Sequence, residues 1–131
     1  MKYMLMMHAP RGTGDYAISD WTADALQAHM AHMHDINREL TAAGELVDAQ
    51  GLTPPGQARL VRAGQGGAPV TDGPFAESKE FLAGYWVVDV DGPERAYAIA
   101  ARASAAPGPD GAPLNMPIEV RQVMRAPAAD A

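Results

Sequence analysis

The chain has 131 residues, a length that suits one domain with a core of its own. It contains no cysteine, which excludes disulfides, thiolate nucleophiles and cysteine-based zinc sites and fits a reducing, cytoplasmic location. The net charge of −6 offers no basic surface to a phosphate backbone, so nucleic acid is not expected as a partner.

The first predicted element is a strand at residues 2–8. These residues are apolar at nearly every position, which is typical of a central strand with both faces covered. The apolar run is too short for a signal peptide, and no stretch of the chain approaches the roughly 20 residues of a membrane span. A membrane is therefore not expected as a partner. Proline and glycine at residues 10–14 break the strand.

Residues 21–43 are predicted to form the first helix. Ser19 or Asp20 is expected to cap its N-terminus, and Gly44 follows its last turn as a C-terminal cap. The apolar residues of this helix recur at helical spacing and predict one buried stripe, which consists of Leu26, Met30, Met33, Ile36 and Leu40.

Three histidines lie on this predicted helix. At about 100° per residue, His29 falls about 40° from the centre of the stripe, whereas His32 and His34 fall about 100° from it on opposite sides. We therefore expect His29 to be hydrogen-bonded at the edge of the core, and His32 and His34 not to share a face. His8 ends the first strand and could meet Asp72 across the sheet, although a lone histidine is more often structural.

The rest of the chain predicts strands, a hairpin and a second helix, separated by loops rich in proline and glycine. The strongest strand contains Tyr85 and Trp86, which as successive residues point to opposite faces of a sheet. The elements are a strand at 45–50, a hairpin with strands at 59–62 and 69–71, a strand at 82–90, a helix at 94–103 and a strand at 118–124.

This order predicts an α+β fold, the ferredoxin-like βαββαβ plan with an inserted β-hairpin and an antiparallel sheet. The two most apolar strands, at 2–8 and 82–90, are expected at its centre, with both helices on one face. A second copy of the sheet is the simplest cover for the other face, which predicts a two-fold homodimer in the form of a dimeric α/β barrel. One domain is expected over residues 1–125, followed by a flexible tail at 126–131.

The segment before the strongest strand reads Asp-Gly-Pro-Phe-Ala-Glu-Ser-Lys-Glu over residues 72–80. In the structural interpretation, Asp72 begins a turn that glycine and proline make rigid, and Phe75 is expected to be a buried side chain of the core. As a functional feature, Asp72, Glu77 and Lys79 gather charges beside a central strand, where a carboxylate next to a lysine can act as a general base or bind a polar substrate. Both interpretations stay open.

This segment resembles the DGPF signature of the YCII-related family, in its DGPF-domain subgroup. The resemblance extends from residue 1 to about residue 124 and includes the first strand, the end of the first helix, the 51–55 loop and the last strand. It implies a ferredoxin-like fold that pairs into a dimeric α/β barrel, in a largely uncharacterised family. Some relatives are linked to extracytoplasmic-function sigma factors, and one branch is proposed to be enzymatic from a His/Asp pair in a cleft. Asp72 matches the aspartate of the DGPF signature, and the histidine of that branch corresponds to a position near Met33, which His32 and His34 flank.

Two functions of different classes are therefore expected. The first is a cofactor-free enzyme acting on a small organic molecule in a barrel cleft, with Asp72 as the acid/base and a histidine and Tyr85 assisting; the histidine is His8, His32 or His34. Its substrate-binding residues would be Phe75, Glu77, Lys79 and Trp86.

The second is a non-catalytic dimer that binds a small molecule or regulates a partner, with a sigma factor suggested by family analogy alone. A perturbed pKa within a closed pocket would favour the enzyme, and an exposed DGPF loop beside an apolar patch would favour the regulatory dimer. No metal site is predicted. No cofactor is predicted either, because the chain has no phosphate-binding glycine motif and no dinucleotide fingerprint.

Overall fold

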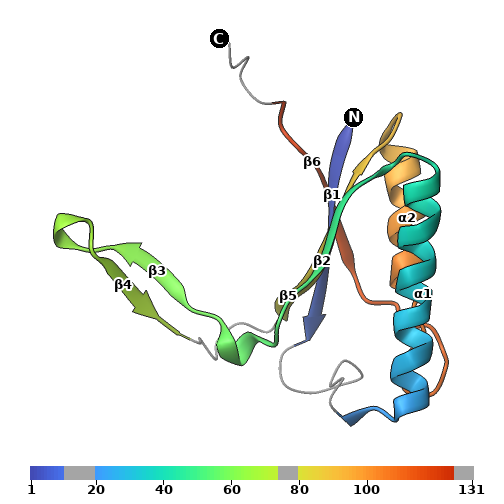
Figure 1. The fold of residues 1–131 in the computed structure, drawn as a ribbon, viewed down its shortest axis with the longest axis horizontal. Coiled ribbons are helices and arrows are strands. Elements are labelled where there is room, and N and C mark those ends of the chain that lie inside the picture. The colour runs from blue at the N-terminus through green and yellow to red at the C-terminus, as the bar shows by residue number, and fades with distance from the viewer. Residues whose placement is uncertain (11–19, 74–79, 126–131) are drawn as a thin grey trace.

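A computed structural model describes residues 1–10, 20–73 and 80–125 of the chain. Four strands form an antiparallel sheet in the order β2-β5-β1-β6, and both helices lie on one of its faces (Figure 1). This arrangement confirms the α+β class and the central position of the two most apolar strands. The strands of this sheet are β1 (Lys2–Pro10), β2 (Leu46–Gly51), β5 (Glu80–Asp89) and β6 (Ile118–Gln122).

The two helices are α1 (Ala23–Ala42) and α2 (Pro93–Ser104). Thr22 caps α1, because its Oγ1 accepts a hydrogen bond from the backbone nitrogen of Ala25 at 3.1 Å. The predicted cap at Asp20 is therefore wrong, and Ser19 lies outside the described residues. Gly44 follows the helix with φ of 73°, in the left-handed conformation expected after a helix end.

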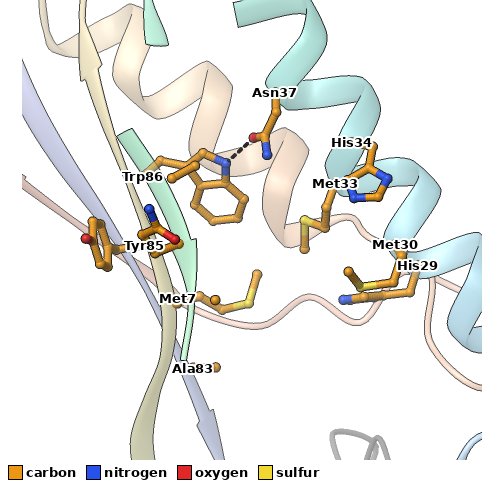
Figure 2. A pocket seen from close by; sticks show the side chains of 13 residues that line it. Met7, His29, Met30, Met33, His34, Asn37, Ala83, Tyr85 and Trp86 are labelled. Atoms are coloured by element: carbon orange, nitrogen blue, oxygen red, sulfur yellow. Dashed lines mark hydrogen bonds between the residues drawn. The ribbon is translucent and has the colours of Figure 1, made fainter. Parts of the chain in front are cut away.

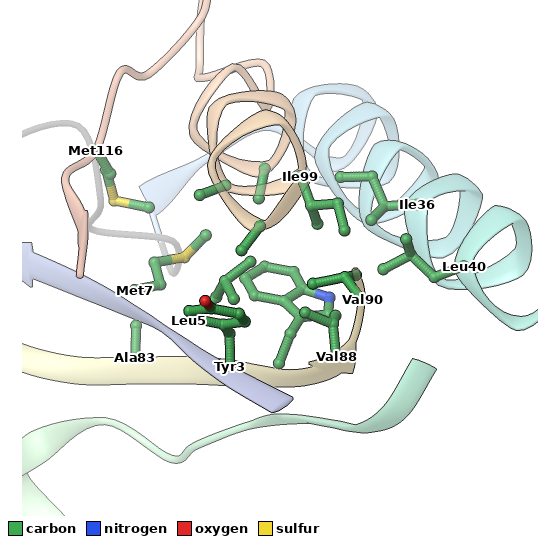
Figure 3. Close-up of a cluster of buried hydrophobic side chains, with 14 of the residues drawn as sticks. Tyr3, Leu5, Met7, Ile36, Leu40, Ala83, Val88, Val90, Ile99 and Met116 are labelled. Atoms are coloured by element: carbon green, nitrogen blue, oxygen red, sulfur yellow. The ribbon is translucent and has the colours of Figure 1, made fainter. Parts of the chain in front are cut away.

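The hydrophobic core lies between the sheet and the helices (Figure 3). Alternate residues of β1 and β5 point into it, because successive side chains of a strand face opposite ways. The largest fully buried side chains come from both strands and from α1, and they are Leu5, Val88, Ile36 and Leu40.

The opposite side of the sheet, which we call the open face, carries side chains in cross-strand rows. Tyr85 is paired with Met6 on β1, Met6 is paired with Glu119 on β6, and Gln50 on β2 is paired with Tyr85. Because paired residues share a face, these four side chains cross the sheet in one row. The next row is Asp48, Val87, Met4 and Arg121.

The remaining strands, β3 (Leu60–Ala63) and β4 (Pro69–Asp72), pair only with each other as a two-stranded sheet. This confirms the predicted hairpin, which we call the arm. Figure 1 shows the arm projecting away from the ends of β2 and β5, on the side opposite to the helices. Among the described residues, no helix is long and apolar enough to cross a membrane.

Candidate functional site

A cleft with a volume of about 260 Å³ opens between α1 and the β2–β5 side of the sheet; we call it the α1 cleft. Figure 2 shows side chains of α1 on one side of it and residues of β1 and β5 on the other. Trp86, Met7 and Ala83 form its floor, and these three residues are buried. The base of the cleft is therefore apolar.

Small residues in β5 make room for this cleft. Ala83 and Gly84 lie where the pairing of β1 and β5 shifts register between Met7 and His8. A Cβ atom on Gly84 would lie 2.8 Å from the carbonyl oxygen of Gln50, so β2 approaches β5 more closely here than a side chain would allow. Ala83 and Gly84 therefore leave open, beside the cleft, a space that larger side chains would fill.

The α1 wall of the cleft differs from the predicted buried stripe. Met30 was expected in the core, but 44% of its surface is exposed, and Met30 and Met33 both line the cleft. Ile36 and Leu40 are buried as predicted, Leu26 and Met33 are only partly buried, and His29 is the third buried position of α1. Methionines at helical spacing fit a cleft wall as well as a closed core, because both are apolar.

Trp86 and Asn37 join the floor to the wall. Trp86 faces the helices and is 6% exposed, whereas Tyr85 lies on the open face, as predicted from their succession. The indole Nε1 of Trp86 donates a hydrogen bond to Oδ1 of Asn37 at 2.8 Å. This bond satisfies a buried donor and holds the Asn37 amide at the cleft.

His29 lines the cleft and is 2% exposed. Its Nδ1 is 3.0 Å from the carbonyl oxygen of Pro107, and its ring meets Trp21 edge to face at 5.2 Å between centroids. Burial lowers the pKa of His29 below its ordinary value of 6.5, against a smaller raising effect of the hydrogen bond to Pro107. The hydrogen bond confirms the expectation of a core-edge histidine, and His29 also contributes a neutral imidazole to the cleft.

The other histidines occupy three different places. His34 is exposed and lines the cleft beside Met33 (Figure 2). His32 turns to α2, where its Nε2 lies 2.8 Å from the carbonyl oxygen of Arg102. His8 follows Met6 on the open face, where its Nε2 lies 3.0 Å from Oε1 of Glu119. As predicted, His32 and His34 do not share a face.

The predicted partners of these histidines, Tyr85 and Asp72, make their polar contacts with other residues. The Tyr85 hydroxyl donates to Oδ2 of Asp48 at 3.1 Å on the open face, and this hydrogen bond raises the pKa of Tyr85. Asp72 lies on the arm, where its exposed carboxylate is 3.8 Å from Arg62. Phe75, Glu77 and Lys79 lie outside the described residues. The structure thus brings Trp86, His34 and Tyr85 to the lining of one cleft, although the hydroxyl of Tyr85 is bonded to Asp48, and it places the other described candidates elsewhere.

Sequence reasoning missed the role of Asn37 and of the small residues in β5. Asn37 comes four residues after Met33, so its place on the same helical face was available as a signal. Ala83 and Gly84 interrupt an otherwise bulky strand, which is a signal for a bulge or a close approach. Within the described ranges, no group of three or more histidine and acidic side chains is placed to hold a metal ion.

The βαββαβ sheet with both helices on one face defines a ferredoxin-like α+β protein. Residues 1–110 match the family model of the YCII-related domain, and the chain therefore belongs to the YCII-related family. An uncharacterized protein of Rhizobium meliloti (strain 1021) is 34% identical over 71 residues. That match covers 54% of this chain and 57% of the Rhizobium protein, so it spans little more than half of either.

Proposed function

We propose that the α1 cleft binds a small organic molecule with an apolar body and one polar group, and that His34 performs general acid/base chemistry on that group. One observation carries this proposal. An apolar floor of Trp86 and Met7 faces a helix wall on which His34 and Asn37 lie one turn apart. Such a site can bury an apolar body and orient a polar group.

The lining indicates the class of ligand. Methionine thioethers and an indole make favourable contacts with flat, polarizable rings. The volume of about 260 Å³ is below the roughly 300–1,000 Å³ of pockets that hold drug-sized ligands, so a smaller molecule fits. A phenol, a lactone or a small aromatic acid has these properties.

His34 is suited to proton transfer by its place at the rim. A histidine at an exposed rim can exchange protons with water between turnovers, and histidine is the most common general acid/base in enzymes. His29, five residues earlier, is kept neutral by burial. The imidazole of His29 therefore adds a polar group to the cleft without adding a positive charge.

The segment that follows Asp72 is part of this proposal. It connects the arm to β5, and Ala83 near the start of β5 lines the cleft. In the proposal Asp72 assists a histidine, and Phe75, Glu77 and Lys79 border the substrate. Connectivity along the chain supports this role.

A homodimer also belongs to the proposal. The open face presents Met4, Met6 and Val87, which are only partly buried by this chain. A second copy of the sheet would remove them from water and form an isologous interface. A sigma factor as partner rests on the family resemblance alone.

A second candidate function is a dimer that binds the same ligand without turnover. It is favoured by the contacts of Asp72 and Tyr85, because the carboxylate of Asp72 pairs with Arg62 on the arm and the hydroxyl of Tyr85 is bonded to Asp48. No aspartate or glutamate is among the described residues that line the cleft. Regulation by a bound ligand would need no such group.

Ligand binding is tested with a panel of phenols, lactones and small carboxylates. Trp21→Phe leaves Trp86 as the sole tryptophan, so its fluorescence reports binding at the cleft floor. Ala83→Leu should fill the floor and abolish binding. Ala112→Leu, at an exposed loop position, is the matched control and should leave binding unchanged. Failure of every compound to shift Trp86 emission or to appear in saturation-transfer spectra would refute the proposal.

Catalysis is tested with His34→Gln on any bound compound that is turned over. Loss of a general acid/base should reduce kcat by about 10²–10⁴-fold, with the dissociation constant nearly unchanged. Turnover that survives His34→Gln would contradict the role of His34. Binding without turnover by the unmodified protein would favour the regulatory alternative.

A further inference from the structure

The arm exposes apolar side chains that the rest of the described chain does not cover. Every residue of β3 and β4 is exposed, and Leu60, Val61 and Val70 are 50%, 61% and 52% exposed. An isolated two-stranded hairpin is marginally stable at best in water. A partner that covers the arm would therefore stabilise it.

The register of the hairpin gives its two faces different chemistry. Leu60 pairs with Asp72 and Arg62 pairs with Val70, so one face carries the Arg62–Asp72 ion pair between two aliphatic side chains. The other face has no charge. It consists of Val61, Ala63, Pro69 and Thr71.

The direction of the arm is fixed at its root. Gly73 has φ of 120°, and a Cβ atom there would lie 3.4 Å from the carbonyl oxygen of Ala58. The guanidinium of Arg59 donates to the same oxygen at 2.8 Å. The two ends of the hairpin therefore lie close together at the root. The positive φ of Gly73 sets the direction of the chain at the end of β4.

This direction takes the arm to the side of the open face. Figure 1 shows the helices on one side of the sheet and the arm on the other. A second copy laid on the open face would therefore lie beside the arm. The arm and its root, residues 52–73, carry two arginines and one aspartate in a chain of net charge −6, which favours attraction to the rest of a second copy.

We propose that the arm is a clasp between subunits: its uncharged face packs against a second copy of this chain whose sheet covers the open face. This inference rests on the homodimer in the proposed function and names the element that secures it. The clasp is also connected to the ligand site. The root directly follows Gly51, which lines the cleft, and its first residue, Leu52, donates from its backbone nitrogen to the carbonyl oxygen of Ala83 at 2.9 Å.

The first test places a charge on the uncharged face with Val61→Glu. Glutamate at an exposed position leaves an unclasped monomer folded, but it cannot be buried against a partner without a large cost. We expect the dimer dissociation constant from analytical ultracentrifugation to rise by about tenfold or more. Tyr97→Glu, an exposed position of similar accessibility on α2, is the control and should change nothing.

The second test does not depend on how Val61→Glu folds. Because the chain has no cysteine, Val61→Cys accepts one spin label per subunit. The label should be immobilised in the dimer and become mobile when Met6→Glu on the open face dissociates the dimer.

A label that is mobile in the dimer, or a dissociation constant unchanged by Val61→Glu, would overturn the clasp and leave the homodimer intact. A chain that is monomeric at about 100 μM would refute both, while ligand binding in the α1 cleft would still be tested separately.

Discussion

Trp86 and Asn37, which are 49 positions apart in the chain, connect the centre of the sheet to α1 through a 2.8 Å hydrogen bond. The indole N–H is buried and therefore needs an acceptor. Asn37 supplies this acceptor from the wall of the α1 cleft. The bond thus contributes to stability and also sets the separation of wall and floor where a ligand would bind.

Asn37→Leu should destabilise the fold, because it leaves the Trp86 N–H without its acceptor. We expect a loss of about 1–3 kcal/mol in the free energy of unfolding measured with urea. In the double variant with Trp86→Phe, the loss should be smaller than the sum of the two single losses, since the second change removes the unsatisfied donor.

The matched control for this prediction is Arg38→Ala, at an exposed position next to Asn37 in the same helix. It should change the free energy of unfolding by less than about 0.5 kcal/mol. Equal stabilities for Asn37→Leu and Arg38→Ala would show that the indole hydrogen bond contributes nothing.

Gly84→Ala should also destabilise the protein, because the new Cβ atom would lie 2.8 Å from the carbonyl oxygen of Gln50. Separating β2 from β5 to relieve this contact should cost about 1–3 kcal/mol in thermal or urea unfolding. Gly51 pairs with Gly84, and a Cβ atom there meets nothing within 4 Å. Gly51→Ala is therefore the control, and a loss as large as that of Gly84→Ala would contradict the steric explanation.

The order of elements was predictable because it depends on local periodicity. Residues 2–8 and 82–90 are apolar at nearly every position, and they form the two central strands of the sheet, which have a neighbouring strand on each side. The residue that caps α1 was not predictable, because aspartate and threonine are both common N-caps and the sequence offers Asp20 and Thr22 two positions apart. Met30 shows a second limit, because an apolar residue at helical spacing fits a cleft wall and a closed core equally well.

The candidate site was predicted only in part, because its pairings are not local. Trp86 and His34 do line one cleft, but the charge of Asp72 is matched by Arg62 and the hydroxyl of Tyr85 by Asp48. Both pairings depend on strand register, which no spacing in the sequence reveals. The imidazole of His8 likewise lies within hydrogen-bonding distance of Glu119, which is 111 positions away in the chain.

Stability should fall in mild acid because of His29. Burial lowers its pKa below 6.5 in the folded state, so the unfolded chain takes up a proton as the pH falls through 6.5 while the folded chain does not. The folded state binds fewer protons in this window and loses stability relative to the unfolded state, by at most about 1.4 kcal/mol per pH unit. The loss ends once the pH is below the lowered pKa.

His29→Gln should remove this part of the pH dependence. The difference in unfolding free energy between the variant and the unmodified protein should be constant above pH 6.5 and should shift in favour of the variant at lower pH. Gln27→Ala, at an exposed position of the same helix, should keep the original slope. A slope that His29→Gln leaves unchanged would mean that other groups cause the acid sensitivity.

Arg95 and Glu45 give a prediction of opposite sign. The guanidinium donates to both carboxylate oxygens, at 2.9 and 2.8 Å, and this hydrogen bonding lowers the pKa of Glu45 below its ordinary value of 4.5. The stabilisation is therefore fully present above pH 4.5 and is lost as the pH falls through the lowered pKa. Because Arg95 is half exposed, solvent screening limits the contribution to about 0.5 kcal/mol.

Arg95→Gln should lower the free energy of unfolding by that amount at neutral pH and by progressively less as the pH falls from 4.5 through the lowered pKa of Glu45, below which the carboxyl is protonated in both states. A double-mutant cycle with Glu45→Gln isolates the pair from other effects of either change. A coupling energy that does not fall as the solution is acidified below pH 4.5 would assign the contribution to packing of the arginine side chain over Glu45 and not to its charge.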